Sequence, residues 1–172
     1  MIKVGVFFAD GTEELEALTP VDILKRAGAK VDIISVGGET LNGSHDIKVV
    51  SDKLVKDIRE EDYDALVIPG GMPGAVNISN NENAVKVVKS AYKKGKLIAS
   101  ICASPAVVLS THGLIEGKAT CYPAKDFVNA LGDFYTGSDV EVYKNVITAS
   151  GPKSAFKFAL EICKYLKIEP KF

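Results

Sequence analysis

The stretch that decides the fold is LIASICASPAVVL, residues 97–109. Its first half is a short apolar run that follows Gly95, a pattern typical of a buried strand in a parallel sheet. Its second half places Pro105 at an early helical position ahead of a compact apolar group, which predicts the start of a helix. Cys102 stands between the two halves. A sharp strand-to-helix turn lifts such a side chain above the sheet edge, where free N–H groups and the helix dipole favour a thiolate.

Length and composition indicate one folded domain over residues 1–172. The chain is 47% hydrophobic and 25% charged, as in globular proteins. Its 21 basic and 22 acidic residues give a net charge of -1, which argues against a nucleic-acid partner or an anionic membrane surface. We find no apolar run long enough to span a bilayer and no signal-peptide pattern at the N-terminus, so we expect no membrane association.

Three cysteines are spread along the chain: Cys102, Cys121 and Cys163. None belongs to a Cys-x-x-Cys pair, which argues against a disulfide framework or a zinc site and predicts a reducing, cytoplasmic setting. Cys163 lies on the apolar stripe of the last expected helix, so we interpret it as a core residue. Cys121 has two interpretations, a second thiol near Cys102 or a buried core residue, and burial is the more common fate of a free cysteine.

Apolar runs alternate with helical patterns along the chain, which predicts an α/β fold with a mostly parallel sheet. In such sheets ligands bind beyond the carboxyl ends of the strands. Three loops leave those ends, namely 9–12, 70–74 and the turn at Cys102, and we expect them to meet at one site. The expected strands are 2–8, 30–36, 65–69, 97–101, 134–136, 140–143 and 146–149, with an edge hairpin within 40–52; the expected helices are 13–27, 83–94, 124–131 and a last one that opens at 151–152.

Three glutamates open the first expected helix behind Thr12, its predicted N-cap. Glu13, Glu14 and Glu16 all suit the positive end of the helix dipole. Glu16 shares an apolar stripe with Pro20, so burial would raise its pKa and keep it protonated near neutral pH. The stripe that contains Glu14 is also apolar, and periodicity does not choose between the two carboxyl groups.

Five motifs, in order along nearly the whole chain, resemble the DJ-1/ThiJ/PfpI superfamily and its DJ-1-like branch. They are GTEELE at 11–16, PVD at 20–22, PGG at 69–71, ICASP at 101–105 and GP at 151–152. The resemblance implies a flavodoxin-like three-layer sandwich, a homodimer, and chemistry without a metal or an organic cofactor. It implies that Cys102 is the nucleophile at the elbow, that Glu16 is its general acid and base, and that the N–H groups of Gly71 and Ala103 bind an oxyanion or an oxidised sulfur.

The chain departs from better-known members at several positions. Ser104 stands where glycine is common, Tyr122 where some members carry a histidine beside the cysteine, and His45 where some offer an arginine across the dimer interface. Ala103 follows the cysteine where the protease branch has histidine, which counts against a Cys-His peptidase. The residues that we expect to line the site are Asp22, Arg26, His45, Gly70, Ser104, Cys121 and Tyr122.

Two functions of different classes follow from the resemblance. The first is an enzyme acting on small α-oxoaldehydes such as methylglyoxal, free or as glycated adducts on amines and thiols, which is glyoxalase or protein deglycase chemistry. The second is a redox sensor or chaperone-like protein of the oxidative stress response, in which Cys102 is itself oxidised. An intracellular cysteine peptidase is a distant third. Both leading functions use the same cysteine, so the sequence does not separate them.

Overall fold

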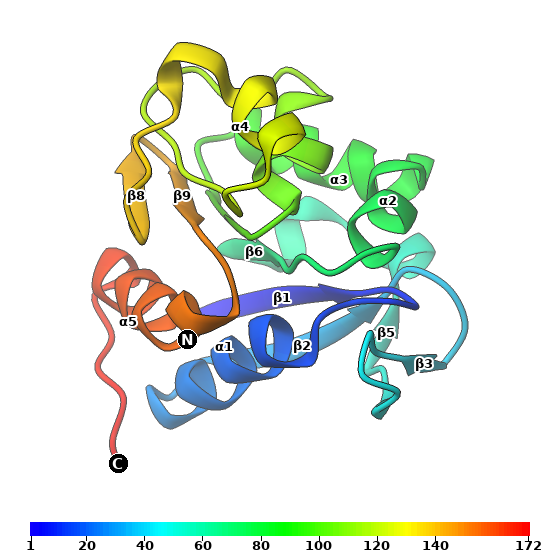
Figure 1. Cartoon of the computed structure of the whole chain (residues 1–172). Helices are drawn as coiled ribbons and strands as arrows, with labels where there is room; N and C mark the ends of the chain where they lie inside the picture. The colour runs from blue at the N-terminus through cyan, green and yellow to red at the C-terminus, as the bar shows by residue number, and fades with distance from the viewer.

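The computed structural model describes all 172 residues and is built on a seven-stranded sheet (Figure 1). The strands of this sheet are β1 (Lys3–Phe8), β2 (Lys30–Ser35), β5 (Lys53–Leu54), β6 (Ala65–Ile68), β7 (Leu97–Ile101), β8 (Val140–Tyr143) and β9 (Val146–Ala149). They follow one another in the order β5-β2-β1-β6-β7-β9-β8. Every neighbouring pair is parallel except β8 and β9, so the predicted mostly parallel sheet is confirmed.

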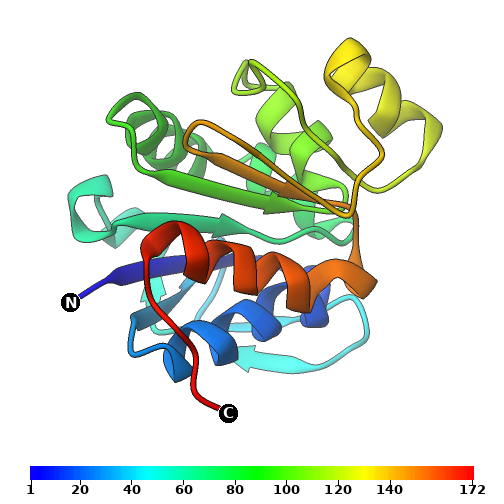
Figure 2. The ribbon, with the colours of Figure 1, turned by 90° about the vertical axis from the view of Figure 1, so that its left-hand side faces the viewer.

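Helices cover both faces of the sheet. They are α1 (Glu14–Arg26), α2 (Gly74–Ser79), α3 (Glu82–Lys93), α4 (Lys125–Leu131), α5 (Ala155–Leu166) and a π-helical segment, η3 (Pro105–Ser110). α1 and α5 lie side by side on one face (Figure 2), while α2, α3 and η3 lie on the other. This is the expected three-layer sandwich. No helix combines the length and the apolar character that crossing a lipid bilayer requires.

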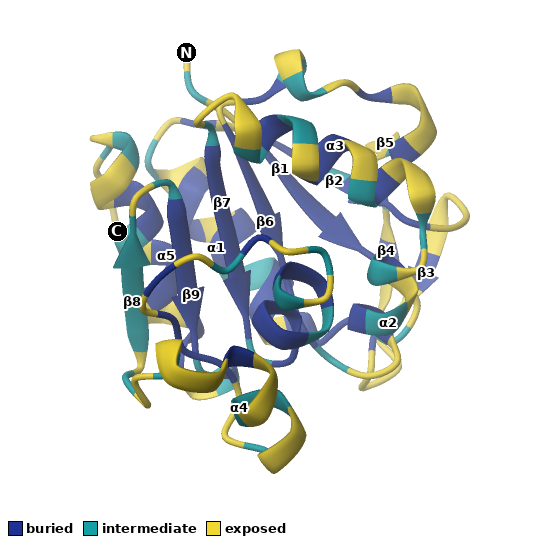
Figure 3. Ribbon diagram, turned by 90° about the horizontal axis from the view of Figure 1, so that it is seen from above, coloured by how far each residue is buried: buried dark blue, intermediate teal, exposed yellow.

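Two apolar cores hold the layers together, one on each side of the sheet. Phe8 packs with Leu24 and Phe158 beneath α1 and α5, whereas its neighbour Phe7 packs with the residues beneath α3 and η3. Successive side chains of a strand point to opposite faces, so each central strand feeds both cores. The central strands are accordingly buried along their whole length (Figure 3), which explains their uninterrupted apolar sequences.

The strand order creates a crevice at one end of the sheet. From β1 the chain passes to β2 on one side, and it later returns to β6 on the other side of β1. In an open α/β sheet such a reversal leaves a cleft beyond the carboxyl ends of the strands. The loops that follow β1, β6 and β7 therefore converge there, as predicted.

Two expected strand regions differ from the structure. The hairpin within 40–52 is not an edge of the main sheet: β3 (Thr40–Asn42) and β4 (Lys48–Val50) pair only with each other. The expected strand at 134–136 is absent, because η4 (Gly132–Phe134) occupies its start and Tyr135 makes only one isolated bridge. α2 was not predicted, since six residues with glycine in the first position carry too little periodic signal.

Candidate active site

Cys102 sits at the expected elbow between β7 and η3. Its backbone has φ +66°, a left-handed conformation that is strained for any residue except glycine. Two hydrogen bonds hold the turn: the N–H of Cys102 donates to the carbonyl oxygen of Ala149 at 2.9 Å, and its carbonyl oxygen accepts from the N–H of Tyr122 at 2.8 Å. A strained backbone conformation that neighbouring segments hold in place is typical of a residue whose functional side chain must project in one direction.

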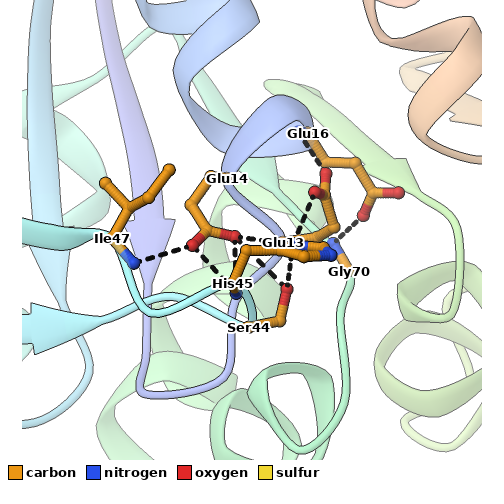
Figure 4. A network of polar contacts seen from close by, with 7 residues as sticks. All are labelled: Glu13, Glu14, Glu16, Ser44, His45, Ile47 and Gly70. Carbon is orange, nitrogen blue, oxygen red and sulfur yellow. Dashed lines mark hydrogen bonds and ion pairs between the residues drawn. The ribbon is translucent and has the colours of Figure 1, made fainter.

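Glu16 approaches the same point from α1 and is completely buried. Its Oε1 accepts a hydrogen bond from the N–H of Gly70 at 3.0 Å, while its Oε2 has no nitrogen or oxygen donor (Figure 4). The backbone N–H of Glu16 donates to the carboxylate of Glu13 at 3.0 Å, which caps α1. The structure therefore separates the two candidate carboxyl groups: Glu16, and not Glu14, faces the cysteine.

Gly70 allows the carboxyl group and the cysteine to meet. A methyl group at Gly70 would lie 2.7 Å from Cβ of Cys102 and 2.7 Å from Oε1 of Glu16. Real Cβ atoms do not approach other atoms this closely, so only glycine fits between the two side chains. Gly70 therefore contributes to the site in two ways: its missing side chain leaves room for the two groups, and its N–H donates to Glu16.

Burial raises the pKa of Glu16 to about 7, and the negative charge of Glu13 adds to this effect. The Cys102 thiol and the Gly70 N–H oppose it by hydrogen bonding to the carboxylate. The expected protonation of Glu16 near neutral pH is thus supported by its surroundings. A carboxyl group that titrates near neutral pH can both accept and donate a proton there.

The expected lowering of the Cys102 pKa is wrong for this site. Burial raises the pKa of the thiol, and the charge of Glu16 raises it further. The N–H groups of Ala103 and Gly71 lower it, but they do not outweigh the two other effects. Because two adjacent negative charges in a buried site repel each other, Cys102 and Glu16 carry at most one between them at neutral pH.

Gly71 and Ala103 provide the predicted pair of N–H donors, and both donors act on the sulfur. Ser104, another expected site residue, links the segments that carry them. Its buried hydroxyl donates to the carbonyl oxygen of Pro69 at 2.5 Å, which ties the turn after β7 to the loop after β6. Its role is therefore to fix the two loops relative to each other.

Glu14 anchors the β3–β4 turn to the start of α1. Its carboxylate accepts hydrogen bonds from the N–H groups of His45 at 3.0 Å and Ile47 at 3.1 Å (Figure 4). Burial raises the pKa of Glu14, but these donors outweigh it, so that the pKa is lowered. Glu13, Glu14 and His45 could together ligate a cation, since their ligand atoms lie within 4.8 Å of one another. The backbone donors already satisfy Glu14, however, so the cluster is explained as a loop anchor.

Three of the expected lining residues lie elsewhere. Asp22, Arg26 and His45 line a groove of about 710 Å³ on the outer face of α1. Asp22 and Arg26 form an exposed ion pair of 2.6 Å on one helix. Cys121 is completely buried against Ala119 and Leu131, which favours its interpretation as a core residue.

Neither histidine of the chain is a partner for the cysteine. His45 contacts Glu14 at 3.2 Å, and His112, which follows η3, contacts Ser79 at the end of α2 at 3.0 Å. Tyr122 occupies the position where some members of the superfamily that the sequence resembles have a histidine. Tyr122 is 46% exposed. The only titratable side chain that interacts with the thiol is therefore Glu16.

Comparison with known proteins identifies the family. A model of the DJ-1/PfpI family matches residues 2–165. The chain belongs to the DJ-1/PfpI family. "Protein DJ-1 homolog B" of Arabidopsis thaliana is 38% identical over 95% of this chain, which spans only 38% of the Arabidopsis protein's length. "Glutathione-independent glyoxalase DJR-1.2" of Caenorhabditis elegans is 33% identical over 92% of this chain and 84% of the relative.

Solved structures of the family share this fold. A structure described as "Toxoplasma gondii DJ-1, oxidized" superposes with a TM-score of 0.92 at 42% identity, covering 96% of this chain and 91% of the other. Agreement at that level confirms the flavodoxin-like arrangement expected from the resemblance. It also assigns the three converging loops to a family fold rather than to a chance juxtaposition.

The residue that sequence reasoning missed is Glu13. Thr12 was the expected cap of α1 because hydroxyl side chains are preferred there, but its oxygen instead accepts the N–H of Ala9 and closes the preceding turn. Glu13 takes the capping position, three residues before Glu16. Glutamate is an uncommon cap, so its spacing from Glu16 was the only available signal.

Proposed function

We propose that this protein is a cofactor-independent enzyme that converts small α-oxoaldehydes such as methylglyoxal, free or as adducts, into 2-hydroxy acids. The observation that carries the proposal is the contact of Glu16, with a pKa of about 7, and Cys102 across Gly70. A nucleophile beside a group that exchanges protons at neutral pH is what this conversion requires. The name of the Caenorhabditis elegans relative, a glutathione-independent glyoxalase, supports the same chemistry.

In the first step, the Cys102 sulfur attacks the aldehyde carbon while the Glu16 carboxylate takes the thiol proton. The C–S bond forms, and the C=O electron pair moves to oxygen, where the N–H groups of Gly71 and Ala103 stabilise the oxyanion. The protonated Glu16 then gives its proton to that oxygen, which leaves a hemithioacetal. This sequence needs no thiolate in the resting protein, so it agrees with the raised pKa of Cys102.

In the following steps, Glu16 moves a proton between adjacent carbons. The carboxylate removes the C–H proton of the hemithioacetal carbon, and the electron pair moves to the neighbouring carbonyl oxygen to give an enediolate. The hydroxyl proton of the first carbon then passes to that oxygen, the first C=O bond re-forms, and the protonated Glu16 gives its proton to the neighbouring carbon. The product is a thioester of Cys102. Water then breaks the C–S bond, which releases the 2-hydroxy acid and restores the thiol. The sum is one aldehyde and one water converted to one hydroxy acid.

The test is consumption of methylglyoxal by the purified protein, with detection of the 2-hydroxy acid. The Cys102→Ser variant is the matched control, since it replaces only the sulfur atom by an oxygen atom. We expect aldehyde loss and acid formation only with the unmodified protein. Equal aldehyde loss in the two proteins would overturn the proposal.

We propose as a second candidate that Cys102 acts as a redox sensor. The observation in its favour is that the N–H groups of Gly71 and Ala103 act on the sulfur, because the same donors would hold a sulfinate. The description of the Toxoplasma gondii relative as oxidized agrees with this chemistry. The sulfur attacks one peroxide oxygen, the O–O bond breaks and water leaves, giving a sulfenic acid; a second peroxide gives the sulfinic acid.

Mild peroxide treatment followed by mass spectrometry of peptides tests the redox candidate. We expect Cys102, which is only partly buried and whose thiol proton Glu16 can accept, to gain oxygen well before Cys121 and Cys163, which are 0% and 2% exposed. Oxidation of the two buried cysteines at the same rate as Cys102 would contradict a sensing role. Oxidation of Cys102 without methylglyoxal turnover would favour the sensor over the enzyme.

We propose that the groove along α1 is the interface of a homodimer. Six apolar side chains line it, and four of them are exposed in the single chain: Leu15 at 58%, Ile47 at 51%, Phe156 at 52% and Phe172 at 76%. Phe172, at the end of the chain, stacks on Phe156 with ring centroids 5.9 Å apart. Apolar side chains gathered around one groove are typical of a surface that another protein covers.

A charge introduced into the lining of this groove is expected to dissociate the dimer. We expect Leu15→Asp to raise the dissociation constant by at least about 100-fold, because a buried unpaired carboxylate costs several kcal/mol. Analytical ultracentrifugation measures the effect. The matched control is Phe134→Asp, at an exposed aromatic residue outside the groove. An unmodified protein that sediments as a monomer at all concentrations would contradict the proposed interface.

A further inference from the structure

A second cavity lies beside the Cys102 turn, and the mechanism above does not use it. Its volume is about 550 Å³, and its walls come from three segments, 121–123, 135–139 and 150–154. Cavities of this order hold small organic ligands, whereas a three-carbon aldehyde fills only a small part of one. The cavity therefore has room for a group much larger than the methyl of methylglyoxal.

The cavity begins at residues that are bonded to the Cys102 turn. Tyr122, on one wall, donates its N–H to the carbonyl oxygen of Cys102 at 2.8 Å. On the opposite wall the chain continues directly from Ala149, which accepts the N–H of Cys102 at 2.9 Å. The two walls touch, since a methyl group at Gly151 would lie 3.3 Å from the Tyr122 ring. The cavity therefore adjoins the backbone of the Cys102 turn.

The cavity walls offer aromatic surface and little uncompensated charge. The rings of Tyr122 and Tyr135 both line it, and the Tyr122 side chain is 46% exposed. Asp139 forms an ion pair of 3.6 Å with Lys157, so the positive charge of Lys157 offsets the negative charge of Asp139. Lys153 is the remaining cation at the rim. Aromatic rings prefer to stack on or meet the edge of other rings. This composition suits a neutral or acidic aromatic group.

We propose that this cavity binds the aromatic substituent of an electrophile whose reactive carbon is attacked by Cys102. The inference deepens the proposed function, on which it rests for the reaction itself: the preferred substrates are aryl-substituted α-oxoaldehydes rather than methylglyoxal. The binding part of the inference requires only that Cys102 is accessible. It can therefore be tested without turnover.

The test compares the alkylation of Cys102 by N-benzyl iodoacetamide and by iodoacetamide. Each rate constant is divided by that of the same reagent with free cysteine, which removes differences in intrinsic reactivity. We expect the benzyl reagent to be favoured by about 10-fold, the size of one good aromatic contact, and to show saturation with concentration. A ratio of one would overturn the proposal.

Variants at neighbouring aromatic residues locate the effect. We expect Tyr135→Ala to remove most of the preference for the benzyl reagent and to leave the iodoacetamide rate unchanged, which also shows that the turn is still folded. Phe134→Ala is the matched control, because Phe134 is 43% exposed and does not line the cavity. Tyr122→Ala provides a second variant, in the segment 121–123. If both tyrosine variants keep the preference, the cavity is not the binding site.

The outcomes also separate this inference from the proposed function. A protein that favours the benzyl reagent but consumes no methylglyoxal or phenylglyoxal would retain the cavity assignment and lose the enzymatic proposal. A protein that consumes methylglyoxal and phenylglyoxal with equal kcat/KM, and shows no benzyl preference, would keep the enzymatic proposal and lose the cavity. Preference for phenylglyoxal that Tyr135→Ala abolishes would support both.

Discussion

The Glu16→Gln variant is expected to lose about 100-fold to 10,000-fold of its methylglyoxal turnover, the usual contribution of a general acid and base. Glutamine keeps the hydrogen bond from the Gly70 N–H but cannot accept the thiol proton. The pH profile should change with it. Since Glu16 has a pKa of about 7, the rate of Cys102 alkylation in the unmodified protein should rise through an inflection near neutral pH, and the variant should lack that inflection.

Glu13→Gln is the matched control for this experiment. Its side-chain oxygen can still accept the N–H of Glu16 and cap α1, so the helix remains in place. Only the charge next to Glu16 is lost, and that charge raises the pKa of Glu16. We therefore expect activity to persist with the inflection moved to lower pH. An unchanged profile in Glu16→Gln would contradict the assignment of Glu16 as the proton carrier.

Stability should respond to the same titration. The folded state raises the pKa of Glu16 from 4.5 to about 7, so folding is favoured by protonation. This contribution is fully present below pH 4.5 and is lost as pH rises through about 7, a change of about 3 kcal/mol in the free energy of unfolding. Glu16→Gln should not show it. Denaturant titrations at pH 5 and pH 8 measure the difference for both proteins.

The Gly71→Ala variant is expected to destabilise the fold by about 4 kcal/mol and to remove activity. Gly71 has φ +86°, and a methyl group there would lie 2.4 Å from the backbone nitrogen of Glu13 and 2.5 Å from the carbonyl oxygen of Gly11. Both neighbours are backbone atoms that cannot rotate away. The loops after β1 and β6 would have to separate, which moves Glu16 and one N–H donor away from the sulfur.

Gly28→Ala separates backbone strain from this steric effect. Gly28 has φ +83°, almost the same conformation, but a methyl group there would meet nothing within 4 Å. We expect it to cost only about 1–2 kcal/mol, the penalty of a left-handed residue. Thermal unfolding and Cys102 alkylation distinguish the two variants. Similar losses for both would show that close approach of the loops does not decide the effect.

The fold could be predicted from the sequence because its signals are local and repeated. Buried parallel strands read as uninterrupted apolar runs, and each is bounded by glycine or a helical pattern. The β3–β4 hairpin could not be placed in this way. Its position depends on Glu14, whose carboxylate binds N–H groups about thirty residues further along the chain.

The candidate site could be predicted less completely. Cys102 and the loop at Gly70 and Gly71 could be predicted, because each directly follows an apolar run that reads as a buried strand. The choice of Glu16 over Glu14 needed the family resemblance. Asp22 was misplaced because six residues along an α-helix turn through about 600°, so that it faces about 120° away from Glu16. The charge of the thiol was predicted wrongly because helix-end donors are visible in a sequence, but burial and the repulsion of Glu16 are not.

The position of Gly70 has a consequence for how the protein acquires its reactivity. Gly70 is 54 positions from Glu16 in the sequence, and the contact between them exists only when β1 and β6 are paired. Contacts between distant segments form late, since closing a long loop costs chain entropy before any contact repays it. The reactive pair is therefore a product of completed folding, and a nascent or partly unfolded chain would expose an ordinary thiol in its place.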